Sequence, residues 1–185
     1  MSILSTSLGG VLLVVTCTSC DPADQWGTPP YFERLTGVAF APEGPSIRCQ
    51  KESGFDEVAF VQVRLPREAV DRLRARPGAL SGFPHQLDYE RERKLKTWAS
   101  GPLSAEAQAA LDLALAGAAL AIEESGCGSV SSAEARESVL RAMERPTTFY
   151  TYQYKPVGSE VLAEALDFRV LDLEAGVLYE LVNFS

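Results

Sequence analysis

The chain of 185 residues contains a single histidine, which is the side chain best suited to general acid–base chemistry near neutral pH. His85 lies in the segment GFPHQLD, where Asp88 follows three residues later and could orient the imidazole. No serine stands in a G-x-S-x-G turn, and no cysteine is placed as a reactive nucleophile. We therefore interpret His85 as a loop residue and keep an exported hydrolase with a site near His85 as an alternative.

Carboxylates are plentiful, but their spacing does not define a catalytic pair. Glycoside hydrolysis needs two acids that face each other across a cleft, about 5–9 Å apart, and adjacency in sequence does not provide this. One histidine with scattered carboxylates is too small a ligand set for zinc, and no calcium-loop motif is present. We expect a non-enzymatic protein without a metal or cofactor. The carboxylate pairs that are close in sequence are Glu90 with Glu92, Glu123 with Glu124, and Asp172 with Glu174.

Three tyrosines alternate near the C-terminus in the segment FYTYQYKP. If this segment is a strand, Tyr150, Tyr152 and Tyr154 share one face of it. Tyrosine rings offer flat, amphipathic area that can stack on sugars or hold a peptide, so this face is a candidate surface for a protein or glycan partner. The alternative is that the rings pack under a helix or against a neighbouring strand.

The order of residues in the N-terminal segment indicates how the protein is targeted, not a reaction that it performs. Residues 1–19 contain no Asp, Glu, Lys or Arg, and Leu8–Thr16 is a run of apolar, glycine and threonine residues. Such a run fits the apolar region of a signal peptide and is too short to span a bilayer, which needs about 20 residues. The small residues Thr18 and Ser19 then precede Cys20, and a polar segment that contains proline follows.

An apolar run, small residues, a cysteine and a polar segment together resemble a bacterial lipoprotein signal peptide. The resemblance implies that residues 1–19 are removed, that Cys20 carries lipid, and that residues 20–30 form a tether. It implies a protein of the bacterial cell envelope, held to the inner or the outer membrane by acyl chains on Cys20. The alternatives are that Cys17 carries the lipid, or that residues 8–16 form a buried strand of a cytosolic domain.

Cys49 and Cys127 are the two cysteines that remain beyond the N-terminal segment. An even pair in an exported chain is compatible with an intramolecular disulfide, because disulfides persist in oxidising compartments. We consider this bond and two unrelated buried thiols as the alternatives.

Composition and charge bound the class of protein. The chain is 46% hydrophobic and 23% charged, which is typical of a globular domain, and we expect residues 31–185 to form one domain. The net charge of −8 argues against a nucleic-acid partner, which would require a basic surface. An acidic interaction protein or immunity-type protein of the cytosol, which would neutralise a basic partner, remains an alternative to the envelope protein.

Hydrophobic periodicity predicts the elements. A helix should follow Ser104 and end at SGCGS, and a second should begin with a capping box of Ser131 and Glu134 and end at Pro146. A shorter helix is predicted in REAVDRLRAR, whereas residues 86–98 fit either a helix or a strand. Strands are predicted in LTGVAFAP, residues 46–50, DEVAFVQVRLP, TTFYTYQYKP, ALDFRVLDL and VLYELVNF. The connection EAG between the last two strands, with glycine in the last position, predicts a hairpin turn that ends in a left-handed residue. This order predicts an α+β fold with a mostly antiparallel sheet and two or three helices packed on one face.

Overall fold

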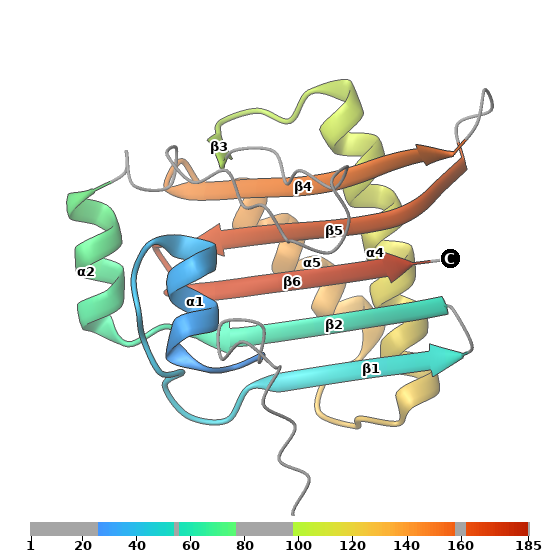
Figure 1. The fold of residues 1–185 in the computed structure, drawn as a ribbon, viewed down its shortest axis with the longest axis horizontal. Coiled ribbons are helices and arrows are strands. Elements are labelled where there is room, and N and C mark those ends of the chain that lie inside the picture. The colour runs from blue at the N-terminus through green and yellow to red at the C-terminus, as the bar shows by residue number, and fades with distance from the viewer. Residues whose placement is uncertain (1–25, 54–55, 77–97, 158–161, 185) are drawn as a thin grey trace, which may run out of the picture.

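The computed structural model describes residues 26–53, 56–76, 98–157 and 162–184. Its centre is a six-stranded sheet with the order β1-β2-β6-β5-β4-β3, and every pair of neighbouring strands is antiparallel (Figure 1). The strands are β1 (Ile47–Ser53), β2 (Asp56–Arg64), β3 (Ala99–Ser100), β4 (Thr148–Val157), β5 (Leu162–Asp172) and β6 (Val177–Phe184).

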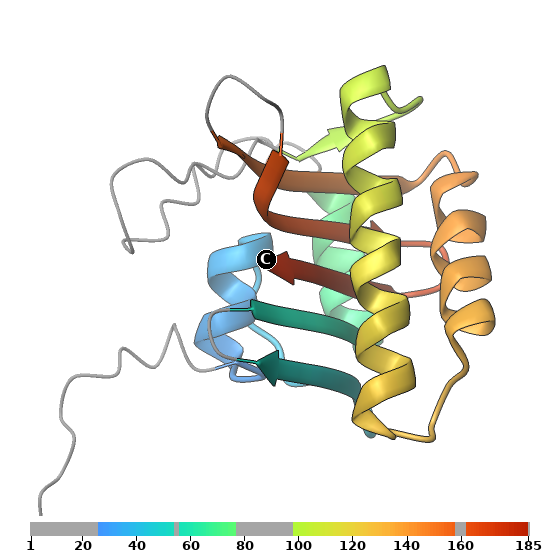
Figure 2. The same ribbon diagram turned by 90° about the vertical axis from the view of Figure 1, so that its right-hand side faces the viewer.

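Helices cover both faces of this sheet, although unequally. The helices α4 (Ala105–Ser125) and α5 (Ser132–Met143) lie on one face, and α1 (Pro29–Thr36) lies on the other (Figure 2). The short helix α2 (Arg67–Ala75) follows β2 and buries Ala69, Val70 and Leu73 in the apolar cluster on the α1 side. The predicted α+β class with an antiparallel sheet is confirmed, and α4 and α5 pack on one face as predicted, whereas α1 and α2 contribute to the cluster on the other face.

Helix α4 forms where the apolar period of 3.6 residues predicts it. Ser104 caps its N-terminus by accepting a hydrogen bond from the Ala107 amide (3.1 Å), and Gly126 ends it in the left-handed conformation with φ of 61°. The seven residues that recur at this spacing on one face are all buried, namely Ala107, Ala110, Leu111, Ala114, Leu115, Ala118 and Ile122. The periodicity of this segment therefore predicted both the helix and its orientation.

Helix α5 begins with the predicted capping box. The Ser131 hydroxyl accepts from the Glu134 amide, and the Glu134 carboxylate accepts from the Ser131 amide (2.9 Å). These hydrogen bonds hold the pKa of the Glu134 carboxyl below its ordinary value. Ala135, Val139 and Ala142 face inward, as their spacing indicates.

The segment before β1 differs from the sequence prediction. Residues 20–30 were assigned to a tether and LTGVAFAP to a strand, but the structure has α1 at Pro29–Thr36, and residues 38–42 belong to no strand. The Thr28 hydroxyl accepts from the Tyr31 amide, two prolines occupy the first helical positions, and Gly37 ends the helix with φ of 74°. These residues are the usual start and stop signals of a helix, and the proline pair had been attributed to a loop.

The hairpin of β5 and β6 turns as predicted. Asp172 Oδ1 accepts from the amides of Glu174 (2.9 Å) and Ala175 (3.0 Å), and Gly176 adopts a φ of 65° that favours glycine. β6 then pairs with β2 along its length, so the C-terminal strand joins the two halves of the sheet. Of the ambiguous segment at residues 86–98, only Trp98 lies within the described residues, where its indole donates to the Leu35 carbonyl (2.9 Å).

Candidate functional site

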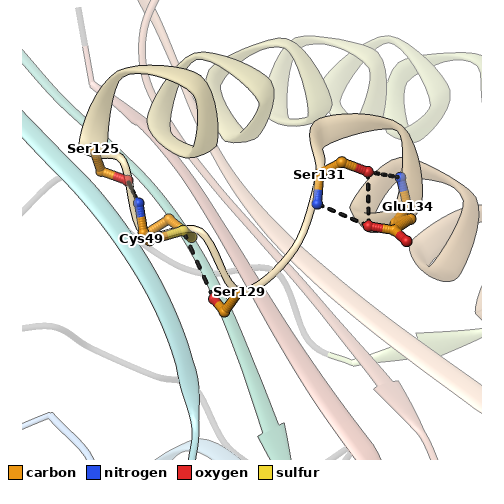
Figure 3. Close-up of a disulfide and its surroundings, with 6 residues drawn as sticks. Cys49, Ser125, Ser129, Ser131 and Glu134 are labelled. Carbon is orange, nitrogen blue, oxygen red and sulfur yellow. Dashed lines mark hydrogen bonds between the residues drawn. A yellow bond between two sulfur atoms is a disulfide. The ribbon is translucent and has the colours of Figure 1, made fainter.

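A disulfide joins Cys49 on β1 to Cys127 in the loop between α4 and α5. The two Cα atoms are 5.5 Å apart, and Cys49 is fully buried beneath α4. Figure 3 shows this loop, in which the Cys127 amide donates to the Ser125 hydroxyl (3.3 Å) just before the capping box of α5. The bond fixes the helical layer to the edge strand of the sheet, and it decides between the two alternatives left open for these cysteines.

The predicted tyrosine surface is not a surface for two of its three members. Tyr150 is 7% exposed and Tyr152 is 5% exposed, and both rings stack on Phe168, with centroids 6.1 and 5.7 Å away. They belong to the core between the sheet and the helices α4 and α5. Their burial agrees with the alternative that the rings pack under the helices, because this face of β4 is the covered one. The side chain of Tyr154 lies outside the described residues.

Other predicted site residues are either outside the described residues or apart from one another. Cys20, His85 and the pair of Glu90 with Glu92 lie outside them. Glu123 accepts from the Ser132 hydroxyl (2.8 Å), whereas Glu124 pairs with Lys51, so these two carboxylates do not face each other. Asp172 and Glu174 both contact the same base, Arg145. None of these described pairs forms the opposed acids of a glycosidase.

A buried cluster of charges, which was not predicted from the sequence, lies on the opposite face of the sheet. Arg169 on β5 donates from Nε to Glu180 Oε1 (2.9 Å) and from Nη2 to Asp167. The Tyr31 hydroxyl of α1 donates to the Glu180 carboxylate, with 2.7 Å to each oxygen. Asp167, Arg169 and Glu180 are each less than one-tenth exposed. The cluster therefore joins β5, β6 and α1 through charge-assisted hydrogen bonds.

Burial dominates the electrostatics of this cluster. It raises the pKa of Asp167 to about 7, against the opposing attraction of Arg169. Burial disfavours the charged Arg169 guanidinium, but the carboxylates of Asp167 and Glu180 outweigh this effect and raise its pKa. Burial, followed by the negative charge of Glu180, raises the pKa of Tyr31 well above its ordinary value. Burial thus favours the neutral form of Asp167, whereas the neighbouring carboxylates keep Arg169 charged.

Two atoms of the cluster, Asp167 Oδ1 and Arg169 Nη1, are buried without a hydrogen-bond partner. Such atoms are uncommon in folded proteins, and each costs free energy of folding. The signal for this cluster was present in the sequence, because Asp167 and Arg169 alternate on the same strand face as Leu171 and Leu173, which are apolar and buried. The missing information was that α1 covers this face.

Trp26, the first described residue, lies on this same face of the sheet. The Trp26 indole donates to Glu180 Oε2 (3.3 Å), and the Arg48 guanidinium lies 4.6 Å from the centre of the Trp26 ring. A cation above an indole face is attracted to its negative quadrupole. These two contacts hold the Trp26 side chain against the α1 side of the sheet.

A cleft of about 620 Å³ lies on the helical side of the molecule. Its apolar lining comes from Leu103, Leu111, Leu140 and Met143, which belong to the segment before α4, to α4 and to α5. Arg145 at its rim is held by Asp172 and lies 3.7 Å from Glu174. The volume falls within the range of small-ligand sites, but the cleft is open and its lining brings together no set of catalytic groups.

Helix α4 is the one described helix long and apolar enough to cross a membrane by length and composition, with a mean hydropathy of 1.4. Half of that stretch is buried inside the fold, as expected for the central helix of a core. Among the described residues, no group of three or more His, Cys, Asp or Glu side chains is arranged to hold a metal ion. Comparisons with protein-family models, with curated proteins and with solved structures found no match to this chain.

Proposed function

We propose that this chain is a lipid-anchored protein of the bacterial cell envelope whose folded domain is a non-enzymatic binding module. The observation that carries the proposal is the disulfide between Cys49 and Cys127, because such bonds persist in oxidising compartments and are rare in the cytosol. The N-terminal segment also supports the proposal, because its residues follow the order of a lipoprotein signal peptide, with Cys20 as the residue that would carry the lipid. A cytosolic interaction protein would require these two cysteines to be reduced.

The position of Trp26 limits the distance between the folded domain and the lipid on Cys20. Trp26 is bound on the α1 face of the sheet, and only five residues separate it from Cys20. Six residue steps span at most about 21 Å, so the tether is short and the domain stays close to the lipid. Because α4 and α5 lie on the face opposite α1 (Figure 2), this arrangement directs the helical layer away from the membrane.

Two features of the described residues support a binding role, namely the cleft on the helical side and the buried cluster of charges. The helical layer carries an open, mainly apolar cleft between α4 and α5, and the lining of this cleft brings together no set of catalytic groups. The buried cluster of Arg169 with Asp167 and Glu180 holds α1 to the sheet. These features support a module that presents a surface rather than one that performs a reaction.

The test compares two single substitutions in the full chain, expressed in a bacterium that processes lipoproteins. With Cys20→Ser the protein should lose incorporation of labelled palmitate and leave the membrane fraction. With Cys17→Ser, the matched control three residues away, labelling and membrane attachment should persist. Palmitate labelling of the Cys20→Ser protein, or an unlabelled wild type in the cytosolic fraction, would contradict the proposal.

A further inference from the structure

Helix α4 carries an exposed apolar stripe. Leu113 is 43% exposed and Leu120 is 41% exposed, and they are the large hydrophobic side chains with high exposure among the described residues. They lie seven residues apart, with Ala116 between them and Ala109 one turn before, and both alanines are exposed. We call Ala109, Leu113, Ala116 and Leu120 the α4 stripe.

The spacing of the α4 stripe suits contact with a second helix. Its members follow one another at steps of four, three and four residues, which places them on one line along the helix surface. This is the alternation of a coiled-coil seam, in which leucines act as knobs and small residues leave holes. From Ala109 to Leu120 the stripe runs for about 16 Å, or three turns. The buried side of α4 packs on the sheet, so the stripe is separate from the core.

Acidic residues border the stripe on both sides. Along the helix, Asp112 and Glu123 lie beside one flank, while Glu106 and Glu124 lie beside the other, and α4 contains no Lys or Arg. Two bases lie nearby, since Lys51 pairs with Glu124, and Arg136 of α5 lines a shallow cleft together with Asp112 and Ala116. Four acids against two bases leave the field around the stripe negative.

We propose that the α4 stripe is the docking surface for a cationic amphipathic helix of a partner protein. The leucines of this chain would pack between apolar side chains of the partner, and Lys or Arg residues beside the partner's seam would face the acids of α4. Charge complementarity selects this occupant. A second copy would bring the same acids against each other, and a bilayer with anionic headgroups would repel them.

This inference rests on the proposed function for its location, because the helical layer faces away from the lipid only if Cys20 is anchored. The binding chemistry itself depends on α4 alone. The two proposals can therefore fail separately. Loss of palmitate labelling would move the domain to another compartment and leave the stripe unchanged, whereas loss of peptide binding would leave the anchor unchanged.

The test uses two synthetic helical peptides with the same leucine and alanine seam. One carries Lys at the flanking positions, and the other carries Glu there. Binding of each labelled peptide to the full chain is measured by fluorescence anisotropy at low and high salt. We expect the cationic peptide to bind at least about tenfold more tightly than the anionic one at low salt, and this difference to shrink as salt screens the charges.

Variants of the full chain locate the surface. Leu113→Ser with Leu120→Ser should weaken binding of the cationic peptide by about tenfold or more, because the apolar contact is lost. Far-ultraviolet circular dichroism and the urea midpoint verify that the variant is folded. Glu106→Gln with Asp112→Asn tests the charges without altering the leucines, and should weaken binding severalfold. The matched control removes two exposed acids of α2, with Glu68→Gln and Asp71→Asn, and should leave binding unchanged.

Several outcomes would overturn the proposal. Equal binding of the two peptides, or binding that is unaffected by the leucine substitutions, would show that the stripe does not select a cationic helix. A dimer in sedimentation velocity that dissociates with the leucine substitutions would assign the stripe to a second copy. Binding to phosphatidylglycerol vesicles that is lost with the same substitutions would assign it to a lipid surface.

Discussion

Replacing both Cys49 and Cys127 by alanine should lower the free energy of unfolding by several kcal/mol. The disulfide joins residues that are 78 apart in sequence, and it connects the edge strand β1 to the loop between α4 and α5. Without the bond, the unfolded chain regains the conformational freedom of that long loop. The folded state keeps its packing around β1, because α4 covers this strand independently of the bond.

The magnitude follows from the length of the loop. In the chain-entropy model, closing a loop with this separation removes unfolded-state entropy worth about 4.5 kcal/mol at 25 °C. Most single domains have a total stability of about 5–15 kcal/mol, so this loss is a large fraction of it. We therefore expect the double variant to unfold at a much lower urea concentration than the oxidised wild type.

Urea titration followed by tryptophan fluorescence measures the effect, with reduced wild type as the matched control. The reduced protein keeps both sulfur atoms and loses only the covalent bond, so it separates the effect of the cross-link from that of the missing side-chain volume. A difference below about 1 kcal/mol between oxidised and reduced protein would refute the reasoning. Alkylation of both cysteines in the native protein without prior reduction would refute it as well.

Three further substitutions test the packing and the buried charges. Tyr31→Phe removes a hydrogen bond to the charged Glu180 carboxylate and should cost about 1.5–3 kcal/mol in urea titration, and no loss would show that α1 is not held by this contact. Gly117→Ala would place a methyl group 2.8 Å from Asn183 Cβ, so it should lower the thermal midpoint although alanine is the better helix former, and a higher midpoint would contradict the close approach of α4 to β6. Because burial raises the pKa of Asp167 to about 7, the folded protein retains a proton that the unfolded chain releases near the ordinary value, so stability falls as pH rises toward 7. Asp167→Asn should therefore stabilise the protein more at about pH 8 than at about pH 4 relative to wild type, and an equal effect at both pH values would contradict the assignment.

Most of the elements predicted from local signals agree with the structure, although the strand predicted in LTGVAFAP is absent. The apolar face of α4, the capping box at Ser131 and the glycine turn before β6 each depend on residues within a few positions of one another. Local sequence specifies such features because helix periodicity, capping and turn geometry are short-range effects. Helix α1 could have been predicted in the same way from Thr28, the proline pair and Gly37.

The features that sequence alone did not predict depend on contacts between distant segments. Whether Cys49 and Cys127 are bonded depends on the placement of β1 beneath the end of α4. The burial of Tyr150 and Tyr152 depends on which face of β4 is covered by α4 and α5. Arg169 is on a strand face that would be open to solvent if α1 did not cover it. Alternation along a strand defines two faces but does not indicate which of them is covered.

Intact-mass spectrometry of the protein recovered from its native membrane fraction tests the central claim most directly. We expect a chain that begins at Cys20, carries the added mass of acyl groups on that residue, and is lighter by the two hydrogens of the disulfide. A full-length chain from Met1 without added mass, recovered in the soluble fraction, would contradict the account.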